Sequence, residues 1–268
     1  MQTFLPYADF ASSAAVLDQA RLGKQRVETL QTLRALVIPD YGWRSHPAIR
    51  MWMGYVPALT LYGLAMVDEW VSRGHQDSTG RQILEFAPEV LDEPDVALPP
   101  WLGDLAFHLS HQSNLVQKAP GIYRDRFPGV PEDLPYVWPE PAKELLPIDP
   151  EGSRLWIWRA PAHPPEGQTR LLMPPGPPGG RIGGKWDRQL QAFEESVTDG
   201  DSIAIADPDG ERFRTGTVGP VLMHEDGLLR DAALTGWLTR TDFDPPALLQ
   251  DPRTLFSVAL PTALRASP

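Results

Sequence analysis

The chain of 268 residues contains no cysteine, which excludes disulfides, thiolate zinc sites and cysteine nucleophiles. It has no run approaching the ~20 apolar residues that cross a bilayer. Its first residues, MQTFLPYADF, lack the basic and apolar regions of a signal peptide, so we expect a cytoplasmic protein without a membrane partner. Basic residues are scarce: the net charge is −11, which argues against a polyanionic partner unless charge is segregated.

The charge is segregated along the sequence. Residues 17–50 contain six basic and three acidic side chains, whereas residues 66–104 contain two basic and nine acidic ones. A local basic surface on an acidic protein is enough to contact phosphates. DNA therefore stays among the candidate partners.

Proline is abundant, with 30 residues and clusters at 94–100, 128–150 and 161–178. Because proline removes a backbone donor and ends helices and strands, such clusters separate elements. The middle cluster is the predicted domain boundary, since helix-period segments precede it and strand-like segments follow it. We expect an α+β chain, with an all-α helical bundle over residues 1–148 and a small β-barrel over residues 153–268.

Hydrophobic periodicity predicts the elements of each half. Apolar residues at three-to-four spacing predict helices over 18–37, in two stretches of 47–73 interrupted by Pro57, and over 101–119. In the second half we expect a helix at 186–197 and strands at 154–159, 201–206, 211–218 and 255–260. The turn DPDG at 207–210 makes the second and third of these strands a candidate hairpin.

One face of the first long helix combines a carboxylate with cations and an amide. Arg21, Lys24, Gln25 and Glu28 are three or four residues apart, so they are neighbours on a helix. Adjacent positive charge keeps such a carboxylate ionised, and it can then stabilise a developing cation or position a proton. The alternative is a solvated helix face with salt bridges.

The segment GWRSHPAIRMW, residues 42–52, places His46 between Arg44 and Arg50 and adds two tryptophans. Cations can contact DNA phosphates while aromatic rings stack on bases. The alternative places Trp43 and Trp52 in the core and His46 in a surface loop.

The segment HLSHQSNLVQK, residues 108–118, places His108, His111 and Lys118 along one helical stripe, with Asn114 beside it. Two histidines one turn apart can bind a metal, but no third ligand has matching spacing and the zincin glutamate is missing. We therefore expect no metal and no cofactor. Two alternatives stay open: polar side chains that face a phosphodiester, or a satisfied hydrogen-bond network between helices.

The second half has no nucleotide-binding loop, since GGRIGGKWD at 179–187 lacks the spacing of a phosphate-binding P-loop. It is rich in tryptophan. Trp156, Trp158, Trp186 and Trp237 are candidates for an aromatic pocket around a flat base, and the alternative is that they fill the core.

Four segments of the first half together resemble the pyrimidine-dimer DNA glycosylase family. They are LDQARLGKQR (17–26), GWRSHPAIRMW (42–52), YGLAMVDEWVSRGH (62–75) and HLSHQSNLVQKAPGIYRDRFPGVPEDLPYVWP (108–139). The similarity covers approximately residues 1–140 and looks closest to an actinobacterial branch of the family. It implies a compact helical bundle that bends double-stranded DNA and flips a nucleotide, in agreement with the helices expected above.

In that family a free N-terminal α-amine attacks the anomeric carbon of the damaged nucleoside, and a glutamate of the first helix supports the imine and the strand-cleaving elimination. The resemblance implies Met1 as the nucleophile and Glu28 as the carboxylate, and we add His111 as a third catalytic candidate. Two positions depart from the family. Arg26-Val27 stands where the family has Arg-Glu, which displaces the carboxylate by about a hundred degrees, and the bulky Gln2 disfavours removal of Met1.

For DNA contacts we predict a polar set drawn from three segments: Arg21, Lys24, Gln25, Arg26, Arg44, His46, Arg50, His108, Asn114 and Lys118. Within this set, Arg26 and Lys118 are expected to contact phosphate, so their loss should weaken binding to all DNA alike.

The second half, with RLWIWR, GGKWD, GDSIAIAD and GTVG in this order, resembles PUA-like barrels, including EVE-type domains that read modified bases in an aromatic cage. Together the resemblances imply a DNA glycosylase, with AP-lyase activity left open, that excises a damaged or modified base in DNA repair or in defence against phages with modified DNA. One alternative is a noncatalytic reader of modified bases. The other is a regulatory or structural protein, and the net charge of −11 favours this second alternative. The oligomeric state is open, with a monomer expected.

Overall fold

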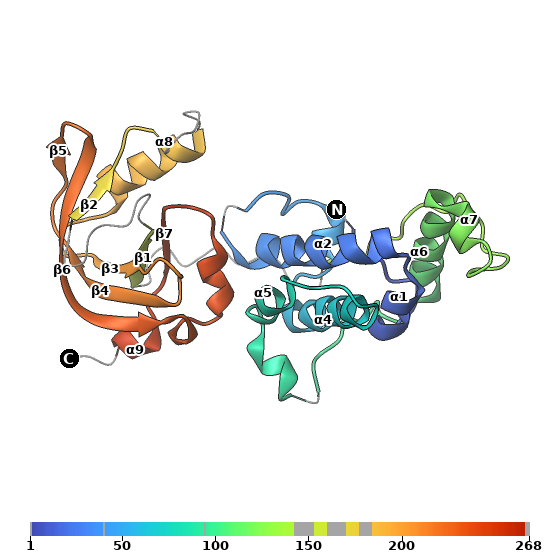
Figure 1. The fold of residues 1–268 in the computed structure, drawn as a ribbon. Helices are drawn as coiled ribbons and strands as arrows, with labels where there is room; N and C mark the ends of the chain where they lie inside the picture. The colour runs from blue at the N-terminus through green and yellow to red at the C-terminus, as the bar shows by residue number, and fades with distance from the viewer. Residues whose placement is uncertain are drawn as a thin grey trace. The chain divides into compact units, whose positions relative to one another are not determined.

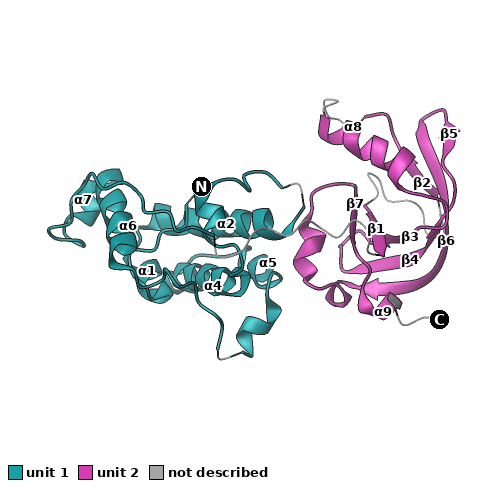
Figure 2. Cartoon of the chain, turned by 180° about the vertical axis from the view of Figure 1, so that it is seen from behind, with its two compact units in different colours: residues 1–148 teal, residues 149–268 magenta. Residues whose placement is uncertain are grey.

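A computed structural model describes residues 2–39, 41–93, 95–141, 153–159, 170–176 and 184–265. The chain divides into two compact units, residues 1–148 and residues 149–268 (Figure 2). The described residues are mixed helix and sheet, with helices in the first unit and a curled sheet in the second (Figure 1). None of the helices in these ranges is both long enough and apolar enough to cross a membrane.

The described residues of the first unit form helices joined by loops and extended segments, and they contain no strand. Its elements are α1 (Phe10–Val16), α2 (Gln19–Val37), α3 (Pro47–Arg50), α4 (Val56–Ser72), α5 (Gly80–Leu84), η1 (Pro88–Leu91), α6 (Leu105–Lys118) and α7 (Pro120–Tyr123). The predicted long helix over 18–37 is confirmed as α2, and the helix expected over 101–119 is confirmed as the shorter α6.

Capping residues explain where the long helices begin and end. The Asp18 carboxylate accepts hydrogen bonds from the backbone N–H groups of Ala20 and Arg21, and so satisfies two donors of the first turn of α2. Pro57 lies in the first turn of α4, where its missing N–H costs nothing, rather than interrupting that helix. Gly74, with φ +87°, follows α4 in the left-handed conformation that glycine adopts most easily.

Helices α2, α4 and α5 pack closely around Gly63. Position 63 of α4 has room only for glycine. A Cβ at this position would lie 2.9 Å from Cγ2 of Thr29 on α2 and 2.9 Å from Cγ2 of Ile83 on α5. The absence of a side chain at Gly63 therefore lets α4 approach α2, the helix that carries the predicted carboxylate.

The described residues of the second unit form seven strands and several short helices. The strands are β1 (Arg154–Trp158), β2 (Arg170–Met173), β3 (Ser202–Ala206), β4 (Arg212–Val218), β5 (Leu222–His224), β6 (Gly227–Thr239) and β7 (Leu255–Ala259). The helical segments are α8 (Gly184–Gln191), the π-helical η2 (Ala192–Ser196), η3 (Arg240–Asp242), η4 (Pro246–Gln250) and α9 (Thr262–Arg265). The predicted hairpin is confirmed, because β3 pairs with β4 in antiparallel register.

The strands form one sheet in the order β2-β6-β4-β3-β1-β7, with β5 paired to β6. The pair β1–β3 is parallel and the other pairs are antiparallel. The 13-residue β6 spans the curve of the sheet, and its register with β4 shifts at Thr215/Gly216, where a bulge increases local twist. The expected barrel is a curled half-barrel in the described residues, since β7 and β2 end the path without pairing.

Apolar side chains cover both faces of this sheet. Trp156 and Trp158 of β1 belong to one buried cluster, whereas Leu155 and Ile157 of the same strand belong to the other. The run RLWIWR therefore forms a central strand buried on both faces, which is typical of a strand with a parallel neighbour.

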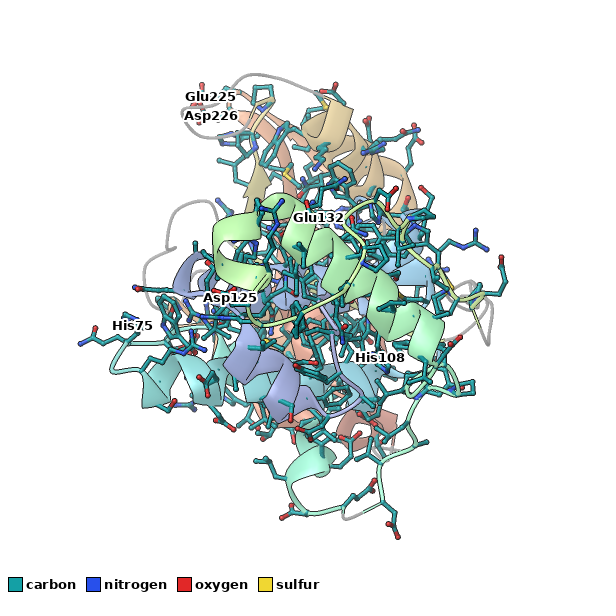
Figure 3. All side chains as sticks on the ribbon, turned by 90° about the vertical axis from the view of Figure 1, so that its right-hand side faces the viewer. His75, His108, Asp125, Glu132, Glu225 and Asp226 are labelled. Atoms are coloured by element: carbon teal, nitrogen blue, oxygen red, sulfur yellow. The ribbon has the colours of Figure 1, made fainter. Side chains whose placement is uncertain are left out.

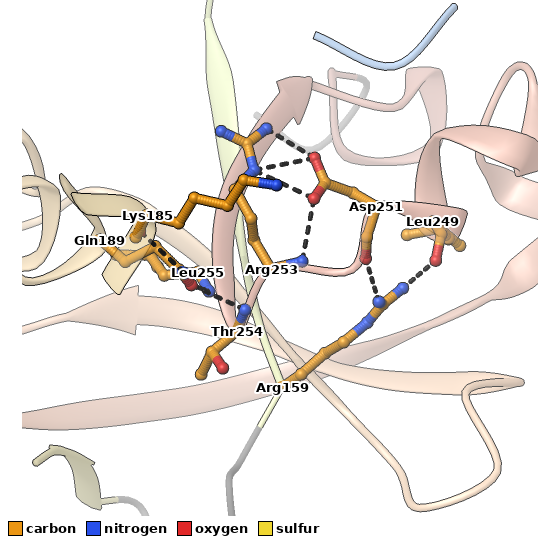
Figure 4. Close-up of polar contacts among 8 residues, drawn as sticks. All are labelled: Arg159, Lys185, Gln189, Leu249, Asp251, Arg253, Thr254 and Leu255. Atoms are coloured by element: carbon orange, nitrogen blue, oxygen red, sulfur yellow. Dashed lines mark hydrogen bonds and ion pairs between the residues drawn. The ribbon is translucent and has the colours of Figure 1, made fainter. Parts of the chain in front are cut away.

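A polar network ties the end of β1 to the segment before β7 (Figure 4). The Arg159 guanidinium donates hydrogen bonds to the backbone carbonyls of Leu249 and Asp251. The buried Asp251 carboxylate accepts from Arg253, while Oε1 of Gln189 accepts from the backbone of two residues at the start of β7. These polar groups satisfy one another within the unit.

Candidate active site

The first unit contains a cavity of about 570 Å³, within the size range of small-molecule sites. Its lining comes from four parts of the sequence: the N-terminal segment, α2, the start of α3, and the end of α6 with the extended segment beyond it. The lining residues are Gln2, Phe4, Ala20, Arg21, Lys24, Gln25, Glu28, His46, Lys118, Tyr136 and Trp138. The predicted helix face Arg21, Lys24, Gln25 and Glu28 thus lines one cavity with His46 and Lys118.

Glu28 is the one carboxylate in the cavity lining, and only 7% of its surface is exposed. The preceding residue, Val27, is 43% exposed and is not part of the lining. One turn earlier, Nζ of Lys24 lies 3.5 Å from Oε1 of Glu28, and Nε2 of Gln25 donates a hydrogen bond of 3.0 Å to Oε2. Residue 28, and not residue 27, therefore presents its side chain to the cavity.

The fully buried Gln25 connects this carboxylate to the N-terminal segment. Its Nε2 also donates to the carbonyl of Gln2 at 2.9 Å, and its Oε1 accepts from the N–H of Phe4 at 2.8 Å and from the hydroxyl of Tyr62 at 2.7 Å. One side-chain amide thus holds the main chain of residues 2–4 beside Glu28. Residue 1 lies outside the described residues, so the predicted nucleophile Met1 has no described geometry.

Side chains of α6 hold the next residues of the N-terminal segment. Nδ1 of His108, a residue labelled in Figure 3, contacts the carbonyl of Leu5 at 2.8 Å, and Nδ1 of His111 accepts from the N–H of Leu5 at 3.1 Å. Gln112 donates to the carbonyl of Pro6 at 2.8 Å. Buried backbone N–H and C=O groups must form hydrogen bonds. Here the side chains of α6 supply the partners that a neighbouring strand supplies in a sheet.

The other polar residues of α6 hold a second extended segment. Ser113 accepts from the N–H of Leu134 at 3.0 Å, and Asn114 donates to the carbonyl of Leu134 at 3.1 Å. Ser110 accepts from the N–H of Val137 at 3.2 Å. The segment HLSHQSNL thus forms a hydrogen-bond network with two extended segments, one of which carries Tyr136 and Trp138 into the cavity lining. The predicted DNA contacts His108 and Asn114 are buried members of this network.

His111 is completely buried and lies outside the cavity lining. Its burial lowers the pKa to about 3, so the ring is neutral at pH 7. Since Nδ1 accepts a hydrogen bond, the proton of the neutral ring is on Nε2. The structure places this residue as a hydrogen-bond partner of the N-terminal segment.

The electrostatic environment of the cavity is set by burial and by the charge of Glu28. Burial raises the pKa of Tyr62 well above its ordinary value and that of Tyr136 to about 12, and the Glu28 charge raises both further. Burial lowers the pKa of His46, and the same carboxylate opposes this effect. At neutral pH both tyrosines are therefore protonated and His46 is mainly neutral.

The remaining predicted cations differ in their surroundings. Arg26 is turned away from the cavity: it forms an ion pair with Asp77, and its guanidinium lies 4.2 Å from the ring centroid of Trp70. Arg44 is partly exposed and Arg50 is exposed, and neither forms an ion pair with a described residue. Sequence analysis assigned both Arg26 and Lys118 to phosphate contacts. In the structure Lys118 lines the cavity and Arg26 does not.

Sequence analysis missed five lining residues, Phe4, Ala20, Gln2, Tyr136 and Trp138, of which the last three carry polar or aromatic groups suited to a site. The amide of Gln2 and the hydroxyl of Tyr136 are buried close to each other without a regular hydrogen bond between them. Trp138 lies 5.1 Å from Tyr136 and 6.2 Å from His46 between ring centroids. The only sequence signal for Tyr136 and Trp138 was the run of aromatics in YVWP, which has no helical or strand period.

The four tryptophans of the second unit do not form one pocket. Trp156, Trp158 and Trp186 belong to a single buried cluster. The indole N–H of Trp156 donates to Asp201 at 3.0 Å, and that of Trp186 to the carbonyl of Pro174 at 3.1 Å. Trp237 stands apart on β6, 53% exposed, with a guanidinium 4.5 Å from its ring centroid. Three of the four are thus core residues, as the alternative interpretation had it.

Among the described residues, one group of three side chains could hold a metal ion. The ligand atoms of His224, Glu225 and Asp226 lie within 4.8 Å of one another at the β5–β6 hairpin, where Figure 3 labels the last two. All three are exposed, and such acidic turns are common without an ion. We assign no metal to this group.

Residues 1–82 match the family described as pyrimidine dimer DNA glycosylase. No curated protein and no solved structure matches the chain. The matched range includes α2 with Glu28, the N-terminal segment and His46, and it ends before α6. The match supports a role as a DNA glycosylase in DNA repair, with DNA as the substrate, and it leaves the second unit without a matched family.

Proposed function

We propose that the first unit is a DNA glycosylase that takes its target nucleotide into the Glu28 cavity. The observation that carries this proposal is the double hydrogen bond of Gln25, which joins the carbonyl of Gln2 to the carboxylate of Glu28. A carboxylate held beside the N-terminal main chain, inside a cavity with cations and aromatic rings, fits the chemistry of the matched family. An ordinary surface salt bridge does not require this arrangement.

In the proposed reaction the α-amine of Met1 attacks C1′ of the deoxyribose. The C1′–N bond to the base breaks, and the base leaves with the electron pair and is protonated. Loss of a proton from the attacking nitrogen and opening of the sugar ring then give an imine at C1′. Glu28 stabilises the positive charge that develops and accepts the proton. Removal of a C2′ proton from the imine expels the 3′ phosphate, which is the AP-lyase step.

The cavity lining suits a nucleotide in its other contacts. Lys24 and Lys118 are exposed cations at its edge, placed to contact phosphates of double-stranded DNA. The partly buried ring of Trp138 offers a stacking surface for a base. A nucleotide must leave the duplex to reach a carboxylate that is 7% exposed, so the proposal includes nucleotide flipping.

We further propose that the second unit is a PUA-like domain that contributes to the choice of DNA. The parallel pair β1–β3, the curled sheet and the long β6 support this proposal. The base that such a protein excises is a damaged base or a modified base of phage DNA, and the two sources are separated by the experiment below.

Borohydride trapping tests the proposal on oligonucleotides that carry an abasic site, a thymine dimer or glucosylated hydroxymethylcytosine. Wild-type protein should form a covalent adduct and release the base from one of the last two. Glu28→Gln keeps the shape of the side chain and should slow base release about 100-fold to 10,000-fold without lowering Tm. Glu89→Gln, at an exposed position on η1, is the matched control.

A second variant tests the amine. One extra residue before Met1 moves the α-amine away from Glu28, because residues 2–6 are held in register by buried hydrogen bonds. The adduct should disappear from this variant. Base release without an adduct in the wild type would replace the amine with water as nucleophile, and full activity of Glu28→Gln would refute the assignment of Glu28. DNA binding without base release from any of these oligonucleotides would favour a noncatalytic reader.

A further inference from the structure

Trp43 has two features that are unfavourable in the free protein. It is 67% exposed, the most exposed tryptophan of the described residues. It is also the only non-glycine residue of the described chain with a left-handed backbone, at φ 73°. A bulky side chain rarely adopts this conformation, because its Cβ crowds the neighbouring carbonyl. Neither burial nor an easy backbone geometry explains why a tryptophan stands here.

Trp43 is the outermost ring of a row that begins in the cavity. Ring centroids lie 5.1 Å apart for Tyr136 and Trp138, 6.2 Å for Trp138 and His46, and 6.3 Å for His46 and Trp43. The first three residues line the cavity and Trp43 does not. Its indole therefore extends this row of rings beyond the cavity lining.

The loop that carries Trp43 is attached to α3. The N–H of His46 donates to the carbonyl of Trp43 at 2.9 Å, and Nδ1 of His46 accepts from the N–H of Ala48 at 3.2 Å. His46 thus caps α3 and at the same time closes the turn that sets the left-handed residue. Arg44 follows Trp43, and Arg50 ends α3, so two cations without described ion pairs lie in the same segment.

We infer that Trp43 enters the DNA duplex at the place that the nucleotide vacates when it moves into the cavity. The inference rests on the proposed function. Removing a nucleotide from the stack leaves its neighbours without a partner, and an inserted aromatic ring restores stacking on them. The left-handed turn holds the indole outward before DNA arrives, so the ring need not reorganise. Trp43 is a positioning residue, since the chemistry takes place at Glu28.

The test compares double-stranded and single-stranded substrates, because only a duplex has a stack to be opened. Trp43→Ala should lower kcat/KM for a thymine dimer in duplex DNA about 10-fold to 100-fold. On the same dimer in single-stranded DNA, the variant should stay within about threefold of the wild type. For Trp43→Phe, the ratio of kcat/KM on the duplex substrate to kcat/KM on the single-stranded substrate should lie between those of the wild type and Trp43→Ala. Leu105→Ala is the control, because it alters an 83% exposed apolar residue at the start of α6. It should leave kcat/KM unchanged on both substrates.

A binding measurement separates this inference from the proposed reaction. In a Glu28→Gln background, 2-aminopurine beside a stable abasic analogue in duplex DNA should be quenched by the indole of Trp43, and Trp43→Ala should abolish the quenching. Equal losses of kcat/KM on both substrates would show that Trp43 only shapes the cavity through His46, and would overturn the inference. Absence of quenching would overturn it as well, even when wild-type protein releases the base. Quenching by a protein that releases no base would instead refute the glycosylase proposal alone.

Discussion

Replacing Gln25 by glutamate changes one atom in the most connected side chain of the candidate site. Oε1 keeps its acceptor role toward Phe4 and Tyr62, but the second group becomes an oxygen instead of an N–H donor. This oxygen then faces the carbonyl of Gln2 at 2.9 Å and a carboxylate oxygen of Glu28 at 3.0 Å. Both neighbours are acceptors, so the ionised form of the new side chain has no partner on that side.

The expected consequence is a pH-dependent loss of stability. Two carboxylates at this distance in a buried site cannot both ionise easily, so the folded protein raises the pKa of the pair above that of glutamate in the unfolded chain. A raised pKa means that stability is greatest at low pH and is lost as pH rises through the folded value. With a shift of about 3 units, Gln25→Glu should lose about 3 kcal/mol relative to wild type between about pH 5 and about pH 8.

Urea denaturation of both proteins at the two pH values measures this difference. Subtracting the wild type removes the contributions of every other titrating group. Gln117→Glu, the same change at an exposed position of α6, should differ from wild type by less than about 0.5 kcal/mol at either pH. If Gln25→Glu and wild type differ in the free energy of unfolding by the same amount at both pH values, Gln25 does not join residue 2 to Glu28 and the described site is wrong.

Three further predictions follow from other contacts. His111 has its pKa lowered to about 3 from 6.5, so stability should fall as pH decreases below 6.5, by about 2 kcal/mol at pH 5; in His111→Gln, urea denaturation should show a smaller decrease. Gly63→Ala should lower the free energy of unfolding by about 1–3 kcal/mol, measured by thermal circular dichroism, because its Cβ meets two side chains at 2.9 Å. Arg26→Gln should lower Tm but leave the salt dependence of DNA affinity unchanged, whereas Lys118→Ala should reduce that dependence by about one counterion without lowering Tm; equal salt slopes for the two variants would contradict these placements.

The helix that carries the site was predictable because its information is local. The cap at Asp18 and the spacing of Arg21, Lys24, Gln25 and Glu28 follow from the 3.6-residue period, and the structure places all four of the latter in one lining. The same period showed that residues 27 and 28 point in different directions. It could not decide which of the two faces the cavity, since that depends on how α2 packs against α4.

The part of the site that was not predictable lies in extended segments. Residues 2–6 and 134–138 have no regular period, and their position depends on hydrogen bonds to α6 across more than a hundred residues in one case. The pattern of histidine and serine on α6 indicated polar partners. It could not tell a phosphate from a buried peptide group, because both offer hydrogen-bonding oxygens.

The tryptophans of the second unit show a similar limit. The sequence predicted a strand at RLWIWR and left two alternatives for its indoles, an aromatic pocket or the core. In the structure β1 pairs with β3 at one edge and with β7 at the other, and a buried apolar cluster covers each of its faces. Whether one or both faces of a strand are buried depends on what packs against the sheet, so the sequence of the strand alone does not determine it.

The hydrogen bonds between α6 and the N-terminal segment also set an order of events during synthesis. Leu5 and its partners His108 and His111 are separated by 103 and 106 residues. At a translation rate of about 5–20 residues per second, the first residues wait roughly 5–20 s on the ribosome before their partners exist. During that interval the main chain of Leu5 and Pro6 lacks the α6 side chains that pair with it in the folded unit. The cavity that Gln2 and Phe4 line therefore forms only after α6 has been synthesised.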